Sequence, residues 1–420
     1  MERQRRALGE EADPLFAALE EAPVASIRLN PAKRLDVPGA PIPWCPEGRY
    51  LDHRPVFTWD PLFHAGCYYV QEASSMFVEQ AVRASGLTHG PIAALDLCAA
   101  PGGKSTHVLS LLDPASLVVS NETVRPRQAA LLENVWKWGS PNAVVTGSPG
   151  AAFGALAGAF DLVLLDAPCS GEGMFRKDPF ARQQWSPTLV QQCATTQRKL
   201  IDDAWCALAP GGTMIYSTCT WAPDENERQV ERLLREHGAE PVPFAVDERW
   251  NIVRTNAGWC FLPHRLAGEG FFLAVVRKPG VRRHPATSDP TERIRMAVNG
   301  TACLVPKGWA PFVHLLERSV RVLSAGTPIA TDAGAPHIAA CLTALPVEPA
   351  IENLELVAME CLRYLRGEAL PDTVAKGYRR VTYEGHGIGL VKGGGNRWNN
   401  LHPKAWRIRM QLPNAPVTLR

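Results

Sequence analysis

The sequence predicts an α/β fold whose central part is a doubly wound, mostly parallel sheet, with a small N-terminal domain before it and further domains after it. Short apolar runs alternate with amphipathic helical stretches from Ile92 to about Arg277, which is typical of parallel strands joined by helices. Small or polar residues follow several of these runs. A basic segment rich in proline and glycine then ends the alternation.

The composition is that of a soluble globular protein. The 420 residues are enough for two or three domains, and 46% apolar and 20% charged residues are ordinary proportions. A net charge of +2 does not by itself identify a nucleic-acid-binding protein. Eleven cysteines without a C-x-x-C pair or metal-type spacing, and no signal-peptide pattern, predict a cytoplasmic protein with reduced thiols and no metal. No apolar stretch reaches eighteen residues, so we expect no membrane span.

Four parts of the chain differ in pattern. Residues 1–90, with an acidic helical pattern around Leu15–Leu19 and a proline-rich segment, predict a small N-terminal domain. Residues 91–278 predict the α/β domain, and Lys278–Pro285 predicts a linker. Beyond it we expect an intermediate domain over 290–370 and a basic domain over 371–420, where nine Lys and Arg face two acidic residues.

The central part contains six predicted strands: Ala93–Leu97, Leu117–Val119, Ala143–Val145, Asp161–Leu165, Met214–Tyr216 and Phe271–Val276. The first strand leads into Cys98-Ala99-Ala100-Pro101-Gly102-Gly103-Lys104 and the predicted helix Lys104–Leu112. Small residues there let backbone N–H groups approach a ligand, and one carrying adenosine fits this position. A phosphate-binding P-loop is disfavoured because its pattern requires glycine at position 98. The alternative is a tight strand-to-helix turn without a ligand.

The second predicted strand ends in Ser120-Asn121-Glu122. A carboxylate at this point is placed to accept hydrogen bonds from ribose hydroxyls, so Glu122 is a second candidate for the ligand site. Arg127 lies in the following helix, where it either pairs with Glu122 or is solvated.

Two cysteines and one carboxylate are predicted to converge on the same edge of the sheet. Asp166 ends a buried strand and precedes the loop with Cys169, whereas Cys219 follows the strand Thr213–Ser217. A free cysteine usually behaves as a small buried hydrophobe. Cysteines that fit this plainer interpretation are Cys193, Cys206 and Cys361. Cys169 and Cys219 differ because both follow strands at the ligand-binding edge.

Methylation at carbon 5 of cytosine is a reaction that needs such a thiol. This carbon is too weak a nucleophile to attack a methyl sulfonium unaided, whereas a thiolate added to carbon 6 moves electron density to carbon 5. A base then removes the carbon 5 proton and the thiol is eliminated. Asp166, protonated or hydrogen-bonded, is expected to donate to the ring nitrogen. Lys104 is expected to lower the thiol pKa or to contact the substrate.

Three motifs resemble those of the RsmF/Sun family of RNA 5-methylcytosine methyltransferases: Cys98–Lys104, Asp166-Ala167-Pro168-Cys169-Ser170-Gly171 and Ser217-Thr218-Cys219-Thr220. The resemblance covers about 20–277 and includes Ser26–Asn30, Gln71–Met76 and Pro263–Phe272. It implies a Rossmann-like methyltransferase domain. It also implies that Cys219 forms the covalent link to carbon 6 and that Cys169 assists product release. The implied holders of S-adenosylmethionine are the 98–104 loop, Glu122, Arg127 and Asp166. Where the family usually has an acidic or amide group near the adenine, this chain has Gly147-Ser148-Pro149.

The C-terminal stretch is similar to the PUA-like domain of the bacterial RsmF branch, through Gly385–Lys392 and Asn399–Arg407. Its basic residues, with Trp398 and Trp406, are expected to contact phosphates and to stack on RNA bases. The alternative is a basic solvated face with the tryptophans in a small core. The resemblance implies 16S ribosomal RNA in the small subunit as partner, and we expect a monomer. Two other functions stay open: the same chemistry on transfer RNA, and an RNA-binding assembly factor without turnover.

Overall fold

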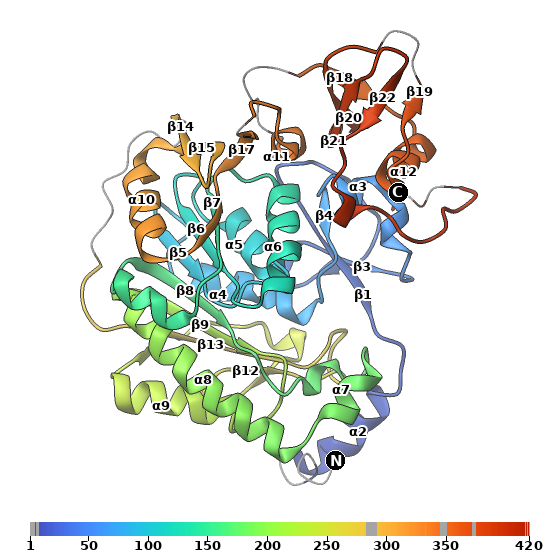
Figure 1. Cartoon of the computed structure of the whole chain (residues 1–420). Helices are drawn as coiled ribbons and strands as arrows, with labels where there is room; N and C mark the ends of the chain where they lie inside the picture. Colours follow the sequence, from blue (N-terminus) through green and yellow to red (C-terminus); the bar gives the residue numbers. More distant parts are fainter. Residues whose placement is uncertain are drawn as a thin grey trace.

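The structure, a computed structural model, describes residues 5, 8–282, 292–331, 333–344, 351–371, 375–415, 417 and 419. Within these residues the chain forms four sheets (Figure 1). The largest is the centre of the α/β core, and the other three are smaller. The last three residues of the predicted linker, 283–285, lie outside the described residues. None of the helices in the described ranges combines the length and apolar character that crossing a membrane requires.

The central sheet has ten strands among the described residues, and its middle is parallel. The parallel strands run in the order β7 (Ala143–Thr146), β6 (Leu117–Asn121), β5 (Ala93–Asp96), β8 (Phe160–Asp166) and β9 (Leu208–Thr218). Antiparallel strands extend it: β16 (Val322–Ala325) beside β7, and β13 (Phe271–Arg277), β12 (Trp259–Phe261), β11 (Val253–Arg254) and β10 (Glu240–Pro241) beyond β9. All six predicted strands are present, so the parallel α/β prediction is confirmed.

Helices cover both faces of this sheet (Figure 1). One face packs on α4 (Val78–Ala84), α5 (Gly103–Leu111) and α6 (Arg125–Trp138). The other packs on η4 (Gly150–Leu156), α8 (Pro187–Ala207), α9 (Glu227–His237) and α10 (Ala310–Ser319). A parallel sheet buried on both faces requires continuous apolar strands, and β8 is buried from Phe160 to Leu165. The doubly wound arrangement is therefore confirmed.

The N-terminal part forms a four-stranded antiparallel sheet in the order β2 (Pro41–Ile42), β3 (Cys45–Leu51), β1 (Ala25–Leu29) and β4 (Tyr68–Tyr69). Its helical elements are η1 (Gly9–Glu11), α2 (Ala12–Ala18), η2 (Phe57–Trp59), α3 (Pro61–His64) and η3 (Ser74–Phe77). The acidic pattern around Leu15–Leu19 thus forms the helix predicted there. One face of β1 packs against the C-terminal part, since Ile27 and Leu29 share an apolar cluster with Leu362 and Val391.

The region after residue 292 differs from the expected boundaries. A three-stranded sheet of β14 (Arg293–Val298), β15 (Thr301–Pro306) and β17 (Thr327–Ala330) packs with η7 (Lys307–Trp309) and α10 on the central core rather than around a core of its own. The same region contributes strand β16 to the central sheet. There β16 pairs with β7 and covers an edge that would otherwise be unpaired.

The C-terminal sheet begins before residue 371. Its order is β18 (Asn353–Glu355), β20 (Tyr378–Tyr383), β21 (His386–Gly393), β22 (Arg397–Asn400) and β19 (Leu370–Pro371), with α11 (Ile338–Leu342), α12 (Ala358–Arg366) and η8 (Lys404–Trp406). The indole of Trp398 is 5% exposed within the shared apolar cluster, and the Arg379 guanidinium lies over its ring. Trp398 is therefore a core residue, and the expectation that it stacks on RNA is wrong. Trp406 is half-buried and contacts Trp136 of α6.

Candidate active site

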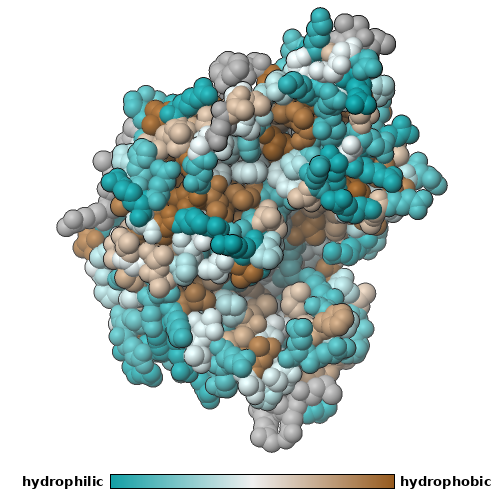
Figure 2. Space-filling model, in the orientation of Figure 1, coloured by the Kyte–Doolittle hydropathy of each residue, from teal (hydrophilic) through white to brown (hydrophobic). Residues whose placement is uncertain are grey.

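A cavity of about 600 Å³ lies at the carboxyl edge of the central sheet, against the N-terminal sheet. The predicted residues that line it are Cys98, Ala99, Ala100, Pro101, Gly103, Lys104, Arg127, Asp166 and Cys219. Figure 2 shows a mostly hydrophilic face that is hollowed between its upper and lower parts. Because the carboxyl ends of adjacent parallel strands share one edge, residues that follow β5, β8 and β9 meet here. Cys193, Cys206 and Cys361 do not line this cavity.

The N-terminal domain supplies a wall that the sequence did not assign. Residues of this wall include Ser26, Tyr69, Gln71 and Glu72. The Glu72 carboxylate accepts hydrogen bonds from the backbone N–H groups of Ser74 and Glu269, which ties this wall to the segment before β13. Part of this wall lies in the Ser26–Asn30 and Gln71–Met76 motifs. These motifs contributed to the family resemblance, but their residue types did not by themselves predict a binding role.

Asp166 and Lys104 form an ion pair inside the cavity. Lys104 Nζ lies 2.8 Å from Asp166 Oδ2, and Ser217 Oγ donates to Asp166 Oδ1 over 2.7 Å. Burial alone would lower the pKa of Lys104, but the Asp166 charge and hydrogen bond outweigh it and raise that pKa. Lys104 therefore stays an ammonium and holds the Asp166 carboxylate in a fixed orientation.

Asp96, which the sequence did not single out, is the buried carboxylate at the end of β5. Its Oδ2 accepts a 2.6 Å hydrogen bond from Ser105 Oγ, whereas Oδ1 accepts none from the described residues. Burial raises the pKa of Asp96 to about 7, with the Asp166 charge acting in the same direction. Asp96 lines the cavity, so its Oδ1 is available to accept a hydrogen bond from a ligand beside the cofactor loop. An aspartate at a strand end is a weak signal by itself.

Glu122 and Arg127 are paired, as one of the two sequence alternatives has it. Arg127 Nη1 lies 3.2 Å from Glu122 Oε2, and Arg127 Nη2 donates to the carbonyl of Ala100 over 2.6 Å. Glu122 is 3% exposed, and its Oε1 accepts from the backbone N–H of Val124. Glu122 does not line the cavity itself, but Arg127 connects it to the 98–104 loop.

The segment Gly147–Pro149 is covered by the chain just before β16. The N–H of Gly147 donates to the carbonyl of Arg321, and the N–H of Arg321 donates to Ser148 Oγ, both over 2.8 Å. Arg321 Nη2 also donates to Gln128 Oε1 over 2.6 Å. The polar groups near this strand end therefore come partly from Arg321 and Gln128.

The two candidate thiols lie side by side but face different surroundings. Cys169 Sγ and Cys219 Sγ are 3.1 Å apart, and the Cys219 N–H donates to Cys169 Sγ over 3.3 Å. Cys219 lines the cavity, whereas Cys169 does not. The hydrogen bond with Cys219 and burial raise the pKa of Cys169 well above its ordinary value. Cys169 thus keeps its proton and can donate it to Cys219, the sulfur that a substrate in the cavity would meet.

The cavity suits a ligand such as S-adenosylmethionine in shape and donor set. Gly102 has a φ of 113°, a conformation that favours glycine, and a Cβ on Gly103 would meet the Tyr69 ring at 3.1 Å. Both glycines thus keep the start of α5 open. Asp96 Oδ1 supplies an acceptor for amino or hydroxyl groups, and the Arg127 guanidinium supplies donors at the cavity wall. The cofactor's sulfonium would bring the methyl group to be transferred.

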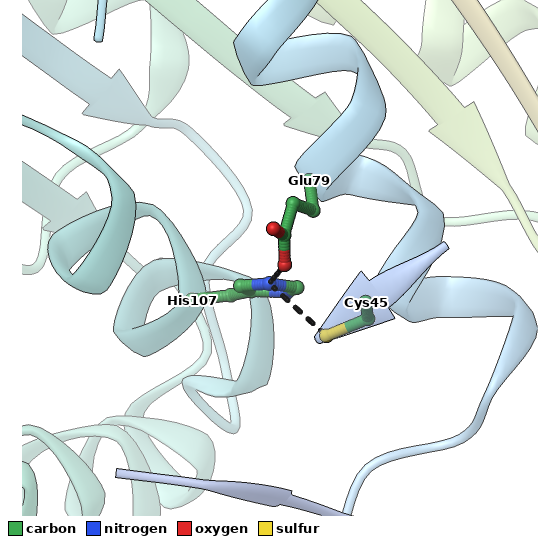
Figure 3. A group of neighbouring side chains, drawn as sticks. All are labelled: Cys45, Glu79 and His107. Atoms are coloured by element: carbon green, nitrogen blue, oxygen red, sulfur yellow. Dashed lines mark hydrogen bonds and ion pairs between the residues drawn. The ribbon is translucent and has the colours of Figure 1, made fainter. Parts of the chain in front are cut away.

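One group of metal-ligand type lies outside this cavity: Cys45, Glu79 and His107 on β3, α4 and α5 (Figure 3). His107 Nε2 and Glu79 Oε2 are 3.1 Å apart, and Arg83 pairs with the other Glu79 oxygen. Burial lowers the pKa of His107 to about 4, so the imidazole is neutral and donates to the carboxylate. These contacts join the N-terminal sheet to the central domain.

The parallel sheet, the glycine-containing loop after its first strand and the strand-end carboxylate are those of an S-adenosylmethionine-dependent RNA methyltransferase. The matching family models are the 16S rRNA methyltransferase RsmB/F over residues 89–277, the N-terminal domain of 16S rRNA methyltransferase RsmF over 1–73, and the methyltransferase RsmF PUA domain over 352–408. The chain belongs to the RsmF family.

Individual relatives agree with this assignment. Ribosomal RNA small subunit methyltransferase F of Cronobacter sakazakii is 34% identical over 417 residues, which cover 90% of this chain and 86% of that protein. The protein of the same name from Serratia proteamaculans is 40% identical over 57% of this chain, an alignment that spans about half of the relative (51%). A methyltransferase homolog from Pyrococcus horikoshii has a TM-score of 0.55 at 26% identity, covering 64% of this chain and 91% of that one. The confirmed fold is thus a Rossmann-like methyltransferase with N-terminal and PUA domains.

Proposed function

We propose that this chain methylates carbon 5 of cytosine in small-subunit (16S) ribosomal RNA, with Cys219 as the nucleophile. The observation that carries the proposal is the position of Cys219, which lines the cavity at 3.1 Å from a second thiol. The same cavity contains the cofactor loop and the Lys104–Asp166 pair. A cavity lined by one thiol, with a protonated thiol directly behind it and a fixed carboxylate beside it, suits covalent catalysis on a pyrimidine ring.

The two cysteines divide the work by their surroundings. The Cys219 thiolate forms a bond to carbon 6, which makes carbon 5 nucleophilic enough to take the methyl group from the sulfonium. After a base removes the carbon 5 proton, the bond between Cys219 and carbon 6 breaks. Cys169 assists this release because its proton lies within hydrogen-bonding distance of the departing sulfur.

Asp166 and Lys104 act as a unit at the pyrimidine ring. Asp166 Oδ2 is held by Lys104 at 2.8 Å, so the pair offers both a fixed carboxylate and a proton donor to the ring nitrogen and its neighbouring groups. Lys104 thus acts through its ion pair with Asp166 rather than through a direct contact with the Cys219 thiol. The cofactor is held by the Cys98–Lys104 loop, by Asp166 and, at its ribose, by Glu122 with Arg127.

The ribosomal target is supported by the relatives' names and by the PUA-domain match over 352–408. Exposed basic side chains of that domain and the residues after it include Lys392, Arg397, Lys404 and Arg409, and such groups bind RNA phosphates. We propose that residues 1–90 and the C-terminal sheet, which share an apolar cluster, together bind RNA beside the methyltransferase domain, 91–278. We further propose a cytoplasmic monomer that needs no metal.

The test is methylation with labelled S-adenosylmethionine on small ribosomal subunits, naked ribosomal RNA and transfer RNA from cells that lack the enzyme. Bisulfite sequencing then maps 5-methylcytosine. A new mark in 16S ribosomal RNA is the expected result. A mark only in transfer RNA would keep the chemistry and overturn the target, and no mark on any substrate would favour the assembly-factor hypothesis.

A further inference from the structure

Two fully buried carboxylates, Glu172 and Glu225, lie behind the paired thiols, and both are 0% exposed. Glu172 follows the loop that carries Cys169, and Glu225 follows the loop that carries Cys219. The hydrogen bonds of each carboxylate cross over to the other loop. Neither residue lines the cavity, so neither can contact a substrate there.

Glu225 holds the loop of Cys169 through the neighbouring Ser170. Its Oε2 accepts from the Ser170 N–H over 2.9 Å, and its Oε1 accepts from Ser170 Oγ over 2.5 Å. Gln197 of α8 donates to the same Oε2 over 2.9 Å. A carboxylate that accepts three hydrogen bonds in the interior fixes the backbone directly beside the sulfur.

Glu172 holds the loop of Cys219 in the same manner. Its Oε2 accepts from Thr220 Oγ1 over 2.9 Å and from the Trp221 N–H over 3.0 Å. Ser170 Oγ and Thr220 Oγ1 are 3.0 Å apart, so the two anchored residues lie against each other between the carboxylates. Each cysteine therefore has an anchored neighbour, and each anchor belongs to the opposite loop.

We propose that Glu172 and Glu225 are positioning residues that form a reciprocal clamp and set the distance between Cys169 and Cys219. The reason to have one is geometric. The two sulfurs lie on loops after different strands, β8 and β9, and proton transfer between them requires hydrogen-bonding distance. A misplacement of about 1 Å can lower a rate on the order of 100-fold. The expected effect of the clamp on turnover rests on the proposed function, whereas its effect on the distance between the thiols does not.

The clamp also acts on charge. Among the groups that raise the pKa of Cys169, after its hydrogen bond with Cys219 and its burial, is the negative charge of Glu225. Burial also raises the pKa of Glu225 itself, which the Ser170 hydrogen bonds oppose. In its ionised form Glu225 therefore adds to the hydrogen bond and burial that raise the pKa of Cys169.

The test compares Glu225→Gln, Glu172→Gln and the milder Ser170→Ala with wild type in the full-length protein. Glutamine is nearly isosteric but uncharged, and it keeps one acceptor oxygen in place of two. Glu225→Gln therefore loses the acceptor that Ser170 Oγ uses, and Glu172→Gln loses the charge that strengthens its two hydrogen bonds. Glu79→Gln is the matched control because Glu79 is also a buried carboxylate, 2% exposed, but its partners are His107 and Arg83 rather than the loops of the two thiols. Thermal unfolding and S-adenosylmethionine affinity establish which variants fold.

The distance between the thiols is measured with phenylarsine oxide, which condenses with two neighbouring thiols to form two As–S bonds and release one water. Cys169→Ala supplies the blank. We expect slower bridging in all three clamp variants, with a turnover loss on the order of 100-fold in Glu225→Gln and accumulation of the covalent RNA adduct. The KM for S-adenosylmethionine should stay unchanged. Ser170→Ala should show smaller losses in the same direction.

Wild-type bridging and turnover in the folded variants would overturn the clamp, and so would equal losses in Glu79→Gln. Ser170→Ala removes a single hydroxyl, so it decides the matter if the glutamine variants do not fold. If the wild-type protein methylates no RNA while bridging still slows in the clamp variants, the clamp stands and the proposed function fails.

Discussion

The active-site edge and the joint between the N-terminal sheet and the central domain both bury ionisable groups, but they use them differently. The joint is defined by Arg28, Asn30, Lys33, Cys45, Glu79 and His107, and two of these side chains, Asn30 and Lys33, donate to backbone carbonyls. Asn30 donates to Gly66 and Trp138, and Lys33 to Ala65 and Lys137. At the edge, side chains bind one another, as in the Lys104–Asp166 pair and the two thiols.

The difference shows which region determines the fold and which remains available for chemistry. A bond to a backbone carbonyl stabilises one arrangement of two chain segments, and its loss leaves a buried acceptor unpaired. A side-chain pair that lines a cavity can exchange one partner for a ligand. Substitutions at the joint should therefore lower stability, and substitutions at the edge should lower activity.

The largest effect is expected at the edge, from Cys219→Ala. Without the thiol, carbon 5 has no activated form, so methylation should fall on the order of 10⁴-fold or more. Cofactor affinity and the midpoint of thermal unfolding should stay close to wild type. Single-turnover transfer of a labelled methyl group measures methylation, and calorimetry measures the cofactor affinity and the unfolding midpoint. Cys193→Ala is the matched control, because Cys193 is half-buried outside the cavity; undiminished turnover in Cys219→Ala would refute the nucleophile assignment.

Cys169→Ala should separate the two thiols. The adduct between Cys219 and carbon 6 should form but fail to resolve, because the neighbouring proton donor is missing. A denaturing gel should then show RNA joined to the protein, and turnover should nearly stop. The double variant Cys169→Ala/Cys219→Ala should show no joined RNA. A Cys169→Ala protein that turns over normally and leaves no adduct would exclude a role in release.

At the joint, Asn30→Ala should act on stability instead. Asn30 is 2% exposed, and its loss leaves the carbonyls of Gly66 and Trp138 without these donors. The free energy of unfolding should fall by about 2–4 kcal/mol in urea titration, with turnover per folded molecule unchanged. Asn134→Ala is the control, since the half-buried Asn134 also donates to a carbonyl, that of Pro101. Equal losses in both variants would contradict the role of the joint.

The chain's alternation of apolar runs and helices predicted the central sheet well, because local periodicity decides these elements. Strand ends then placed Asp166, Cys169 and Cys219 at one edge before any distance was known. The 3.1 Å separation and the choice of the sulfur that faces the cavity depend on loop conformations. These conformations are set by Glu172 and Glu225, whose side chains cross between segments about fifty residues apart.

Long-range packing explains the remaining differences. Strand β16 pairs with β7 across about 180 residues of sequence, and no local pattern encodes that partner. A tryptophan in a basic segment, such as Trp398, looks the same in the sequence whether it is buried in a core or exposed to bind RNA. Its burial follows from the neighbouring strand pair Leu370–Trp398 and from an apolar cluster shared with the N-terminal sheet. Composition alone could not distinguish these cases.

A smaller effect at the edge is expected from Glu122→Gln. The substitution removes the charge that pairs with Arg127 and weakens the acceptor at the end of β6. Affinity for S-adenosylmethionine should fall about tenfold, the cost of one charge-assisted hydrogen bond. Isothermal titration calorimetry measures this affinity. Glu133→Gln is the control, since Glu133 pairs with Lys137 on the same helix; a similar loss there would point to the helix rather than to the ribose contact.

The smallest effect is a difference in pH dependence between the two regions. Asp96, beside Asp166 and Lys104, has a pKa raised from 3.8 to about 7, so the folded state binds more protons and its contribution to stability falls as the pH rises through this range. His107, beside Glu79, Arg28 and Arg83, has a pKa lowered from 6.5 to about 4. Its contribution to stability is present above pH 6.5 and is lost as the pH falls towards 4.

Urea unfolding of Asp96→Asn and His107→Gln from pH 4.5 to 7.5 measures both slopes against wild type. Asp96→Asn should gain stability relative to wild type as the pH rises, because the amide has no charge to bury. His107→Gln should gain as the pH falls, because the amide cannot take up a proton. The two difference curves should therefore slope in opposite directions. Parallel curves would show that the edge and the joint do not differ in the charge state of their buried groups.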